Sequence, residues 1–163
     1  MAAGNRHALA LTEGGELYGW GFGGANGHGH EARTPQLVAA LIGVRVKLAS
    51  AQHDSSCAVT EIGELFTWGG NGLYNLGHGT DTPHVTPKRV VGQTGVRVAA
   101  VALGWTNMLA ADENGVVWGL GSRCVLGLDD EPADVDEVVE HPTPIPALRV
   151  RVRKSPPVVR LRR

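Results

Sequence analysis

The chain has 163 residues, of which 42% are hydrophobic and 19% charged, the composition of one folded globular domain rather than of a disordered segment. The formal net charge of −1 excludes a global field that would draw the chain to nucleic acid or to a membrane surface. No apolar run approaches the roughly 18 residues of a membrane helix. Glycine, at 23 residues, is about twice as frequent as average, and without a collagen period this excess predicts many tight turns.

In chain order, the first element is a short apolar strand over residues 4–12, followed by a Glu-Gly-Gly turn and a returning strand that ends at Trp20. Two short strands joined by a glycine-containing turn are the sequence signal of a β-hairpin. The arrangement returns twice, each time with glycine as the last turn residue, where the backbone needs a positive φ. The three hairpins cover residues 4–20, 56–68 and 108–120, with turn glycines Gly15, Gly63 and Gly115.

Two further markers keep the same order and recur about every 50 residues, which indicates a repeat protein. Val-Arg-Val triplets begin at Val44, Val96 and Val150, and Thr-Pro pairs, each expected before a short strand, begin at Thr34, Thr86 and Thr143. We place the repeat units at about residues 1–43, 44–95 and 96–149, with a fourth unit beginning at 150. Residues 153–163 form a basic Pro/Arg extension.

Each unit holds about four short strands and no apolar pattern with the period of a helix. The hairpin strands are apolar on both faces, as in Cys57-Ala58-Val59, so each sheet needs cover on both sides. This predicts an all-β protein, a β-propeller of four-stranded antiparallel blades stacked face to face. About three blades are too few for a closed ring, since known propellers use about four to eight. We therefore expect an incomplete ring or a fragment that further blades or a larger assembly complete.

The residues of the first hairpin carry a resemblance. The pattern Gly-x-x-His-x-Leu-Ala-Leu-Thr-x-x-Gly-x-Leu-Tyr-x-Trp-Gly, from Gly4 to Gly21, resembles the regulator-of-chromosome-condensation repeat, and Leu76-Gly77-His78-Gly79 is similar to the rest of that unit. The resemblance extends to about residue 152 and implies a seven-bladed propeller, of which this chain holds about three blades. The copies also differ, since the first-copy histidine His7 becomes Ser55 and Asn107, and Leu120 replaces the tryptophan of the third copy.

Other glycines and histidines could indicate a metal site or a phosphate-binding loop. His28 and His78 would suit a metal site, but both occupy one position of a repeated Gly-His-Gly turn, and a zinc site needs three or four converging ligands. The glycine-rich loops open no helix and lack the Gly-Lys-Ser/Thr of a phosphate loop. We therefore predict no metal, no cofactor and no enzymatic activity. Trp105 is predicted to be a surface or blade-edge aromatic residue.

Two cysteines are too few for a disulfide framework. Cys57 aligns with Leu9 and Leu109, which predicts a small buried hydrophobe. We expect an intracellular protein, cytoplasmic or nuclear, with an organelle left open because the N-terminus of the chain need not be that of the whole protein.

Charge gathers in two places, which we predict to bind partners. One is an acidic run that suits a basic protein partner, with a solvated loop insertion as the alternative. The other is a basic C-terminal segment that could contact phosphates, with a solubilising tail as the alternative. The predicted residues are Asp129, Asp130, Glu131, Asp134, Asp136 and Glu137 in the first, and Arg149, Arg151, Arg153, Lys154, Arg160, Arg162 and Arg163 in the second.

The leading functional hypothesis is a non-enzymatic interaction or scaffold module that makes protein–protein contacts within a larger assembly through its propeller loops, with no membrane partner. One alternative, implied by the resemblance, is guanine-nucleotide exchange on a Ran-type small GTPase together with chromatin binding. A regulatory domain attached to a ubiquitin ligase or a kinase is another. A further alternative is contact with nucleic acid or a ribonucleoprotein through the basic C-terminal tail.

Overall fold

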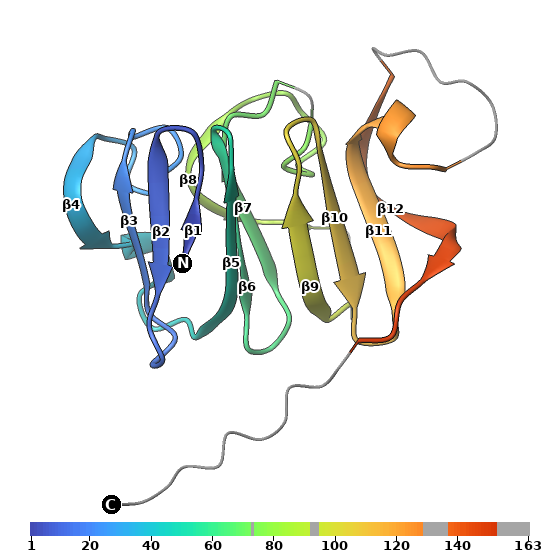
Figure 1. The fold of residues 1–163 in the computed structure, drawn as a ribbon, viewed down its shortest axis with the longest axis horizontal. Coiled ribbons are helices and arrows are strands. Elements are labelled where there is room, and N and C mark those ends of the chain that lie inside the picture. Colours follow the sequence, from blue (N-terminus) through green and yellow to red (C-terminus); the bar gives the residue numbers. More distant parts are fainter. Residues whose placement is uncertain (73, 92–94, 129–136, 153–163) are drawn as a thin grey trace, which may run out of the picture.

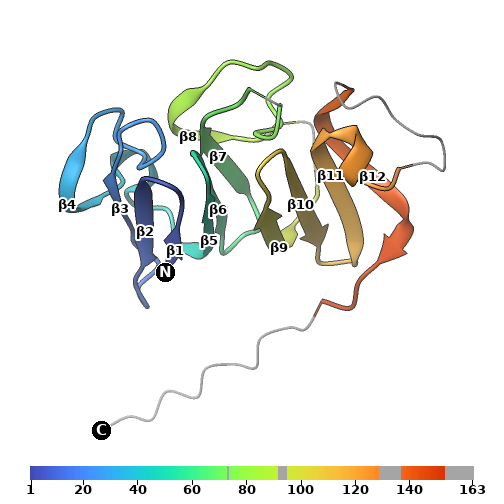
Figure 2. The ribbon, with the colours of Figure 1, turned by 45° about the horizontal axis from the view of Figure 1, so that its top comes forward.

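The computed structural model describes residues 1–72, 74–91, 95–128 and 137–152. These residues form three four-stranded antiparallel sheets that lie side by side along the long axis of the molecule (Figures 1 and 2). The first sheet contains β1 (Ala2–Ala3), β2 (His7–Leu11), β3 (Leu17–Gly21) and β4 (Ala32–Leu37) in spatial order. The predicted all-β propeller of four-stranded blades is confirmed.

The second and third blades repeat this meander. The second contains β5 (Val46–Gln52), β6 (Ser55–Thr60), β7 (Leu65–Gly69) and β8 (His84–Arg89). The third contains β9 (Val98–Leu103), β10 (Asn107–Asp112), β11 (Val116–Ser122) and β12 (Val138–Arg149). Single turns of 3₁₀ helix follow β4 and β11, as η1 (Ala39–Leu41) and η2 (Arg123–Val125). No helix among the described residues is long and apolar enough to cross a membrane.

The Thr-Pro pairs lie inside the outermost strand of each blade rather than before it, which corrects their predicted place. Thr34-Pro35 is within β4, Thr86-Pro87 within β8 and Thr143-Pro144 within β12. Each of these strands pairs with only one neighbour in its sheet. Proline lacks an N–H for the ladder, and an edge strand is where a sheet tolerates it.

The turn glycines join successive blades. Gly15, Gly63 and Gly115 have φ between 81° and 87°, which only glycine adopts without strain. Their carbonyls accept hydrogen bonds at 2.9, 2.9 and 3.0 Å from the N–H groups of Val46, Val98 and Val150, where the chain enters the following unit. Val150 therefore holds the position of Val46 and Val98, so Leu148-Arg149-Val150 is the triplet in register with the two earlier copies.

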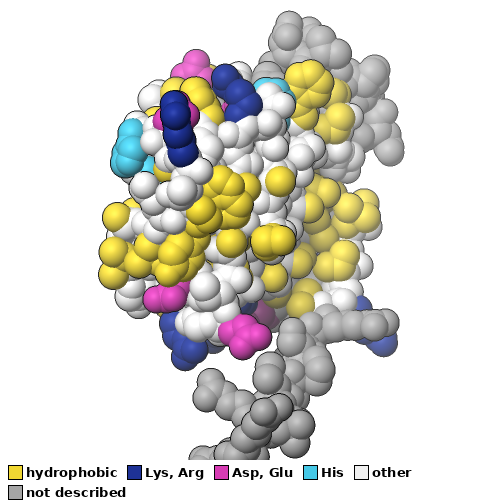
Figure 3. Space-filling view, turned by 60° about the vertical axis from the view of Figure 1, so that its left-hand side comes forward, with side chains coloured by type: hydrophobic (Ala, Val, Ile, Leu, Met, Phe, Trp, Pro, Cys, Tyr) yellow, Lys and Arg dark blue, Asp and Glu magenta, His cyan; other side chains and the backbone are white. Residues whose placement is uncertain are grey.

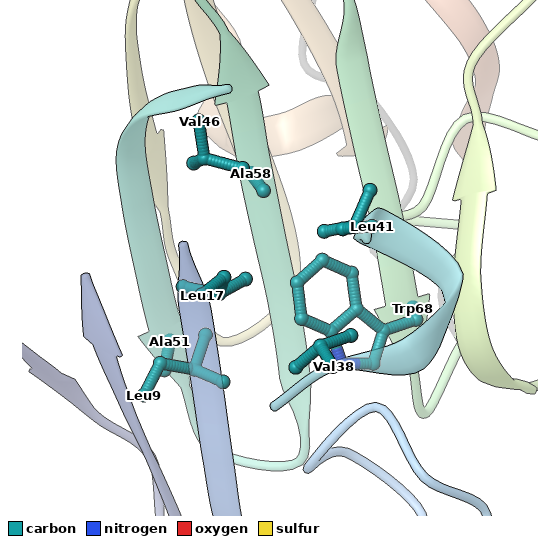
Figure 4. Packing of buried hydrophobic residues seen from close by; sticks show 8 residues of the cluster. All are labelled: Leu9, Leu17, Val38, Leu41, Val46, Ala51, Ala58 and Trp68. Atoms are coloured by element: carbon teal, nitrogen blue, oxygen red, sulfur yellow. The ribbon is translucent and has the colours of Figure 1, made fainter. Parts of the chain in front are cut away.

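The core lies between the blades. Trp68 of β7 is fully buried and packs into the first blade, against Val38, Leu41 and the side chains around them (Figure 4). Leu120 of β11 is likewise fully buried and packs with Cys57, Val59, Leu65 and Val90 of the second blade. Burial raises the pKa of the Cys57 thiol to about 12, so it stays neutral and packs as a small apolar group, as predicted.

Both outer blades keep an open apolar face. A groove of about 500 Å³ runs along the third blade, lined by Leu109, Val117 and Leu148 among others. A smaller one of about 220 Å³ lies on the first blade between Met1, Leu9 and Trp20. Figure 3 shows the side of the molecule that carries the first blade, where hydrophobic side chains gather. These open faces agree with the predicted incomplete ring.

Candidate interaction face

The three blades place equivalent turn residues side by side. They lie in the turn that joins the first two strands of each blade, and they are Asn5, His53 and Trp105. The residues that follow them are Arg6, Asp54 and Thr106. Their carbonyls accept equivalent hydrogen bonds, from the N–H groups of Phe22 (2.8 Å), Gly70 (2.7 Å) and Ser122 (2.9 Å). The three turns are therefore equivalent in their backbone hydrogen bonds as well as in their position within the repeat.

A glycine permits this close approach in each blade. Gly21 and Gly69 end their strands and Gly121 is the last residue but one of β11, all with φ between 95° and 108°. A Cβ atom on any of them would lie 2.2–2.4 Å from the carbonyl oxygen of the facing turn, which is a severe clash. The glycine of each Trp-Gly or Leu-Gly pair thus positions the turn above it.

His53 and Trp105 stack across the boundary between the second and third blades. Their ring centroids are 5.4 Å apart and the rings are inclined by 25°. His53 has φ of 48°, an uncommon value for a residue other than glycine. One face of the Trp105 indole is covered by His53, yet Trp105 remains 69% exposed. The prediction of a surface aromatic residue at this position is confirmed.

Charged and aromatic contacts continue the stack across the first two blades. Asp54 Oδ2 lies 3.6 Å from His53 Nδ1 and 3.5 Å from Arg6 Nη2. The Arg6 guanidinium lies 4.0 Å from the centre of the Phe22 ring, a cation–π geometry. We call these five residues the contact row: Phe22, Arg6, Asp54, His53 and Trp105.

Two hollows flank the stacked pair. One, of about 300 Å³, is lined by His53 and Trp105 together with Gly4, Asn5 and Gln52. The other, of about 250 Å³, is lined on its polar side by Asp54, Ser55 and Asn75. The contact row therefore combines two hollows with exposed aromatic rings, and a protein partner can bind to both.

A buried polar network lies at the first blade interface. The carbonyl of Ala25 accepts hydrogen bonds from Trp68 Nε1 and from Ser56 Oγ, both at 2.8 Å. Since Ser56 donates its only hydrogen there, the His7 Nε2 that lies 2.7 Å from Ser56 Oγ must be the donor in that bond. His7 Nδ1 is buried without a hydrogen-bond partner among the described residues, and burial lowers the pKa of this histidine, so the neutral ring is favoured.

The repeated Gly-His-Gly turns are held by local hydrogen bonds. His28 Nε2 lies 3.1 Å from the Gly19 carbonyl, and His78 Nε2 lies 2.9 Å from Thr67 Oγ1. Burial, with smaller effects from Lys88 and His84, lowers the pKa of His78 to about 4. In the part of the chain that the structure describes, no three His, Cys, Asp or Glu side chains converge in a metal-binding arrangement.

The two predicted charge clusters fall largely outside the described residues. Glu137 is exposed and pairs with Arg123, with Oε1 and Nη1 3.4 Å apart. Arg149 ends β12 and is exposed, as is Arg151. The remaining predicted residues, Asp129, Asp130, Glu131, Asp134 and Asp136 in the acidic run and Arg153, Lys154, Arg160, Arg162 and Arg163 in the basic segment, lie outside the described residues. Both clusters stay predictions.

The sequence reasoning missed the contact row, although a signal was present. Alignment of the copies singled out His7, Ser55 and Asn107, which are one and two positions further along the same turns. The two preceding positions differ even more, with Asn, His and Trp at the first and Arg, Asp and Thr at the second. A turn that changes chemistry from blade to blade while its glycine is kept is expected to point outward.

Comparison with known proteins identifies the repeat. A family model described as the regulator of chromosome condensation (RCC1) repeat matches residues 63–111, and a second model with that description matches residues 1–29. The ultraviolet-B receptor UVR8 of Arabidopsis thaliana is 34% identical over 125 residues. That alignment covers 74% of this chain and 28% of the receptor, so the chain spans under a third of that relative's length.

Solved structures agree. Human WBSCR16 superposes with a TM-score of 0.75 at 29% identity, covering 88% of this chain and 36% of that one. Prp20p from Saccharomyces cerevisiae, described with its binding properties to Gsp1p and histones, gives 0.72 at 21% identity over 88% of this chain and 37% of that one. Yeast RCC1 (Prp20) with Kap60 bound gives 0.70 at 24% identity over 91% and 37%. At these identities the two yeast structures bear on the fold alone.

Proposed function

The chain belongs to the regulator-of-chromosome-condensation repeat family, and from this premise we propose that it is a non-enzymatic interaction module that binds protein partners through the contact row. The single observation that carries the proposal is the row itself, which crosses all three blades and leaves its terminal rings in solvent. Phe22 is 43% exposed and Trp105 is 69% exposed. Trp, Tyr and Arg are the residue types enriched at binding hot spots.

The row is also positioned rigidly. Its turns are fixed by the equivalent backbone hydrogen bonds to Phe22, Gly70 and Ser122 and by a further bond of 2.7 Å from the Asn5 N–H to the His53 carbonyl. Side chains held by a fixed backbone lose little conformational entropy when a partner binds. The exposed aromatic rings on these turns do not pack into the core. Their exposure to water is unfavourable, and binding to a partner is the better explanation for their presence.

The two yeast neighbours are described with protein partners, but at 21% and 24% identity they bear on the fold of this chain and not on its partner. Prp20p is described as binding Gsp1p and histones, and yeast RCC1 as bound to Kap60; all of these partners are proteins. Nucleotide exchange on a Ran-type GTPase with chromatin binding stays a prediction, as does a regulatory domain of a ubiquitin ligase or kinase. So does nucleic-acid contact by the basic tail, which depends on residues outside the described part. An intracellular location remains part of the proposal.

We further propose that additional blades cover the two open faces. Trp20, Trp68 and Leu120 hold one position, since they pair with Ala8, Ser56 and Met108 in their respective hairpins. Trp68 and Leu120 are each buried by the preceding blade. Trp20 lines an open groove instead, so a preceding blade is the expected cover. The groove of the third blade is the matching surface for a following blade.

The proposal is tested by replacing both exposed rings, Phe22→Ala together with Trp105→Ala, and recovering partners from a nuclease-treated extract. Ile62→Ala is the matched control, because Ile62 is 64% exposed on a hairpin turn between β6 and β7. By quantitative mass spectrometry, we expect the double variant to recover at least about tenfold less of each specific protein partner than the unaltered protein. The control should recover the same amount as the unaltered protein. Equal recovery with both variants would contradict the proposal.

A further inference from the structure

We propose that the hollow of about 250 Å³ beside Trp105 binds the guanidinium group of an arginine presented by a protein partner. This inference deepens the proposed function and rests on it, because it names the chemistry that the contact row recognises. Four features carry it: an exposed indole, a carboxylate with an unpaired oxygen, a buried amide oxygen that lacks a donor, and a lining that holds no Lys or Arg among the described residues.

The aromatic wall comes from Trp105. Since His53 stacks on one face of the indole at 5.4 Å, the ring is held in place and is only partly covered. A guanidinium is planar and weakly hydrated, so it stacks on an aromatic ring at a lower desolvation cost than a lysine ammonium. The chain already contains one such pair on this face, with Arg6 at 4.0 Å from the Phe22 ring centre.

The carboxylate is that of Asp54. Its two neighbours, the Arg6 guanidinium and the His53 imidazole, both approach the same oxygen, Oδ2, at 3.5 and 3.6 Å. Such long contacts between partly exposed groups are weak. The other oxygen, Oδ1, is buried in the present rotamer and has no hydrogen-bond partner among the described residues. Rotation about the terminal bond of a carboxylate is easy, and the Asp54 side chain is 28% exposed, so Oδ1 can turn toward an incoming donor without backbone movement.

The amide is that of Asn75, which is only 4% exposed. Its Nδ2 faces Ser55 Oγ at 3.4 Å and the Trp105 carbonyl at 3.5 Å. The Ser55 hydroxyl donates its hydrogen to the Gly70 carbonyl at 2.8 Å, so both neighbours of Nδ2 can only accept. This fixes the orientation of the amide, and Asn75 Oδ1 is left as a buried acceptor without a donor. Leaving such a group unpaired is unfavourable, so a donor supplied by a ligand would stabilise the complex.

The residues that line the hollow favour a positively charged ligand. Among the described residues, the lining of the hollow includes the Asp54 carboxylate and the His53 imidazole, and no Lys or Arg. A phosphate or an acidic side chain would meet a negative charge and acceptors here, whereas a guanidinium brings up to five N–H donors in one plane. The volume of about 250 Å³ exceeds that of one guanidinium, so water is expected to fill the remainder.

The test uses the indole N–H signals of the ¹⁵N-labelled full chain. Trp105 is assigned by Trp105→Phe, and the protein is titrated with acetyl-Gly-Arg-Gly-amide and with the same peptide containing citrulline, which is nearly isosteric but uncharged. We expect the arginine peptide to shift the Trp105 signal with a Kd of about 1–10 mM, as suits a single side chain. The citrulline peptide should bind at least about tenfold more weakly, a difference that a charged hydrogen bond supplies.

A carboxylate pair gives the matched variants. Asp54→Asn should weaken binding of the arginine peptide about tenfold or more. Glu64→Gln should leave it unchanged, although the Glu64 side chain is as exposed as that of Asp54, at 29% against 28%, and is also paired with an arginine. Because the comparison of the two peptides uses the unaltered protein, it does not depend on whether either variant folds.

Several results would overturn the inference. They are the absence of a Trp105 shift at 20 mM arginine peptide, equal binding of the citrulline peptide, an equal shift with inorganic phosphate or acetyl-Gly-Glu-Gly-amide, or unchanged binding by Asp54→Asn. If any of these occurs while the Phe22→Ala, Trp105→Ala double variant still loses its protein partners, the arginine site alone is refuted. If the double variant keeps its partners as well, the proposed function fails independently.

Discussion

The two blade interfaces of this molecule are closed at the same positions by different chemistry. In the first, the fully buried indole of Trp68 reaches from the second blade into the first and donates to the Ala25 carbonyl. In the second, Leu120 fills the same position with no polar atom. Both interfaces are formed, so packing of an apolar side chain is what the blade boundary requires. The hydrogen-bond network around Ala25 is an addition to it.

On the molecular surface the aromatic ring lies at the other interface. The first interface is bridged by an ion pair, between Arg6 and Asp54, whereas the second carries the stacked rings of His53 and Trp105. The large indole is thus inside at the first boundary and outside at the second. Since the second boundary closes without a buried indole, Trp105 is not needed for packing. This contrast is why we assign Trp105 to binding rather than to the fold.

Removing the buried indole should break the first interface. We expect Trp68→Ala to lower the free energy of unfolding by about 3–5 kcal/mol, because it leaves a large cavity between the blades. Urea unfolding followed by circular dichroism measures the loss. Trp105→Ala serves as the control and should change stability by no more than about 0.5 kcal/mol. Equal losses for the two variants would contradict the inside–outside contrast.

The second interface should be weakened less by the same kind of change. Leu120→Ala removes a smaller side chain and should cost about 2–4 kcal/mol in the same unfolding experiment. A loss as large as that of Trp68→Ala would show that the two boundaries are not closed by packing volume alone. A loss below about 1 kcal/mol would mean that Leu120 does not fill the interface.

Acid should act on the first interface through His7. In the folded chain the pKa of His7 is lowered by burial, and that of His78 is lowered to about 4 from its ordinary value of 6.5. The contribution of the neutral rings is therefore fully present above pH 6.5 and is lost as pH falls below 6.5, down to about 4 for His78. Because His78 is partly exposed, we expect a loss of about 1–2 kcal/mol from it.

The measurement is the free energy of unfolding in urea between pH 7.5 and pH 4.5. His7→Asn, which introduces the residue found at the equivalent position 107, should flatten the slope over this range, and the double variant with His78→Asn should flatten it further. Carboxylates that titrate in the same range act equally on all three proteins. An unchanged slope in the double variant would refute the assignment of the pH dependence to these two histidines.

The smallest effect is expected from the surface bridge of the first interface. Arg6→Ala removes one partly exposed ion pair and one cation–π contact, so it should lower stability by about 0.5–1 kcal/mol or less. Its effect on capture of protein partners should be larger, since Arg6 links Phe22 to Asp54 within the contact row. A stability loss above about 2 kcal/mol would mean that the row is part of the fold.

Much of the fold could be predicted because its signals are local and periodic. The turn glycines, the short apolar strands and the Trp-Gly pairs are each visible within a few residues, and repetition removes their ambiguity. The burial of Cys57 followed from the same alignment. The place of the Thr-Pro pairs was wrong because the sequence does not show which strand lies at the edge of its sheet, where proline is tolerated.

The contact row could not be predicted in the same way. His53 and Trp105 are far apart in sequence and meet only because successive blades stack with their turns aligned. The left-handed backbone of His53 is not visible in its sequence context either. Sequence reasoning favoured the charge runs instead, because such runs are visible without any knowledge of neighbours in space.

Site-directed photocrosslinking tests the central claim most directly. A benzophenone amino acid at position 22 keeps a ring on the contact row and leaves Trp105 intact, and the same group at position 62 reports on an exposed turn between β6 and β7. We predict discrete, nuclease-resistant crosslinks to protein partners from position 22, at least about tenfold above those from position 62. Equal yields from both positions, or crosslinks from position 62 alone, would contradict the claim that this chain binds proteins through the contact row.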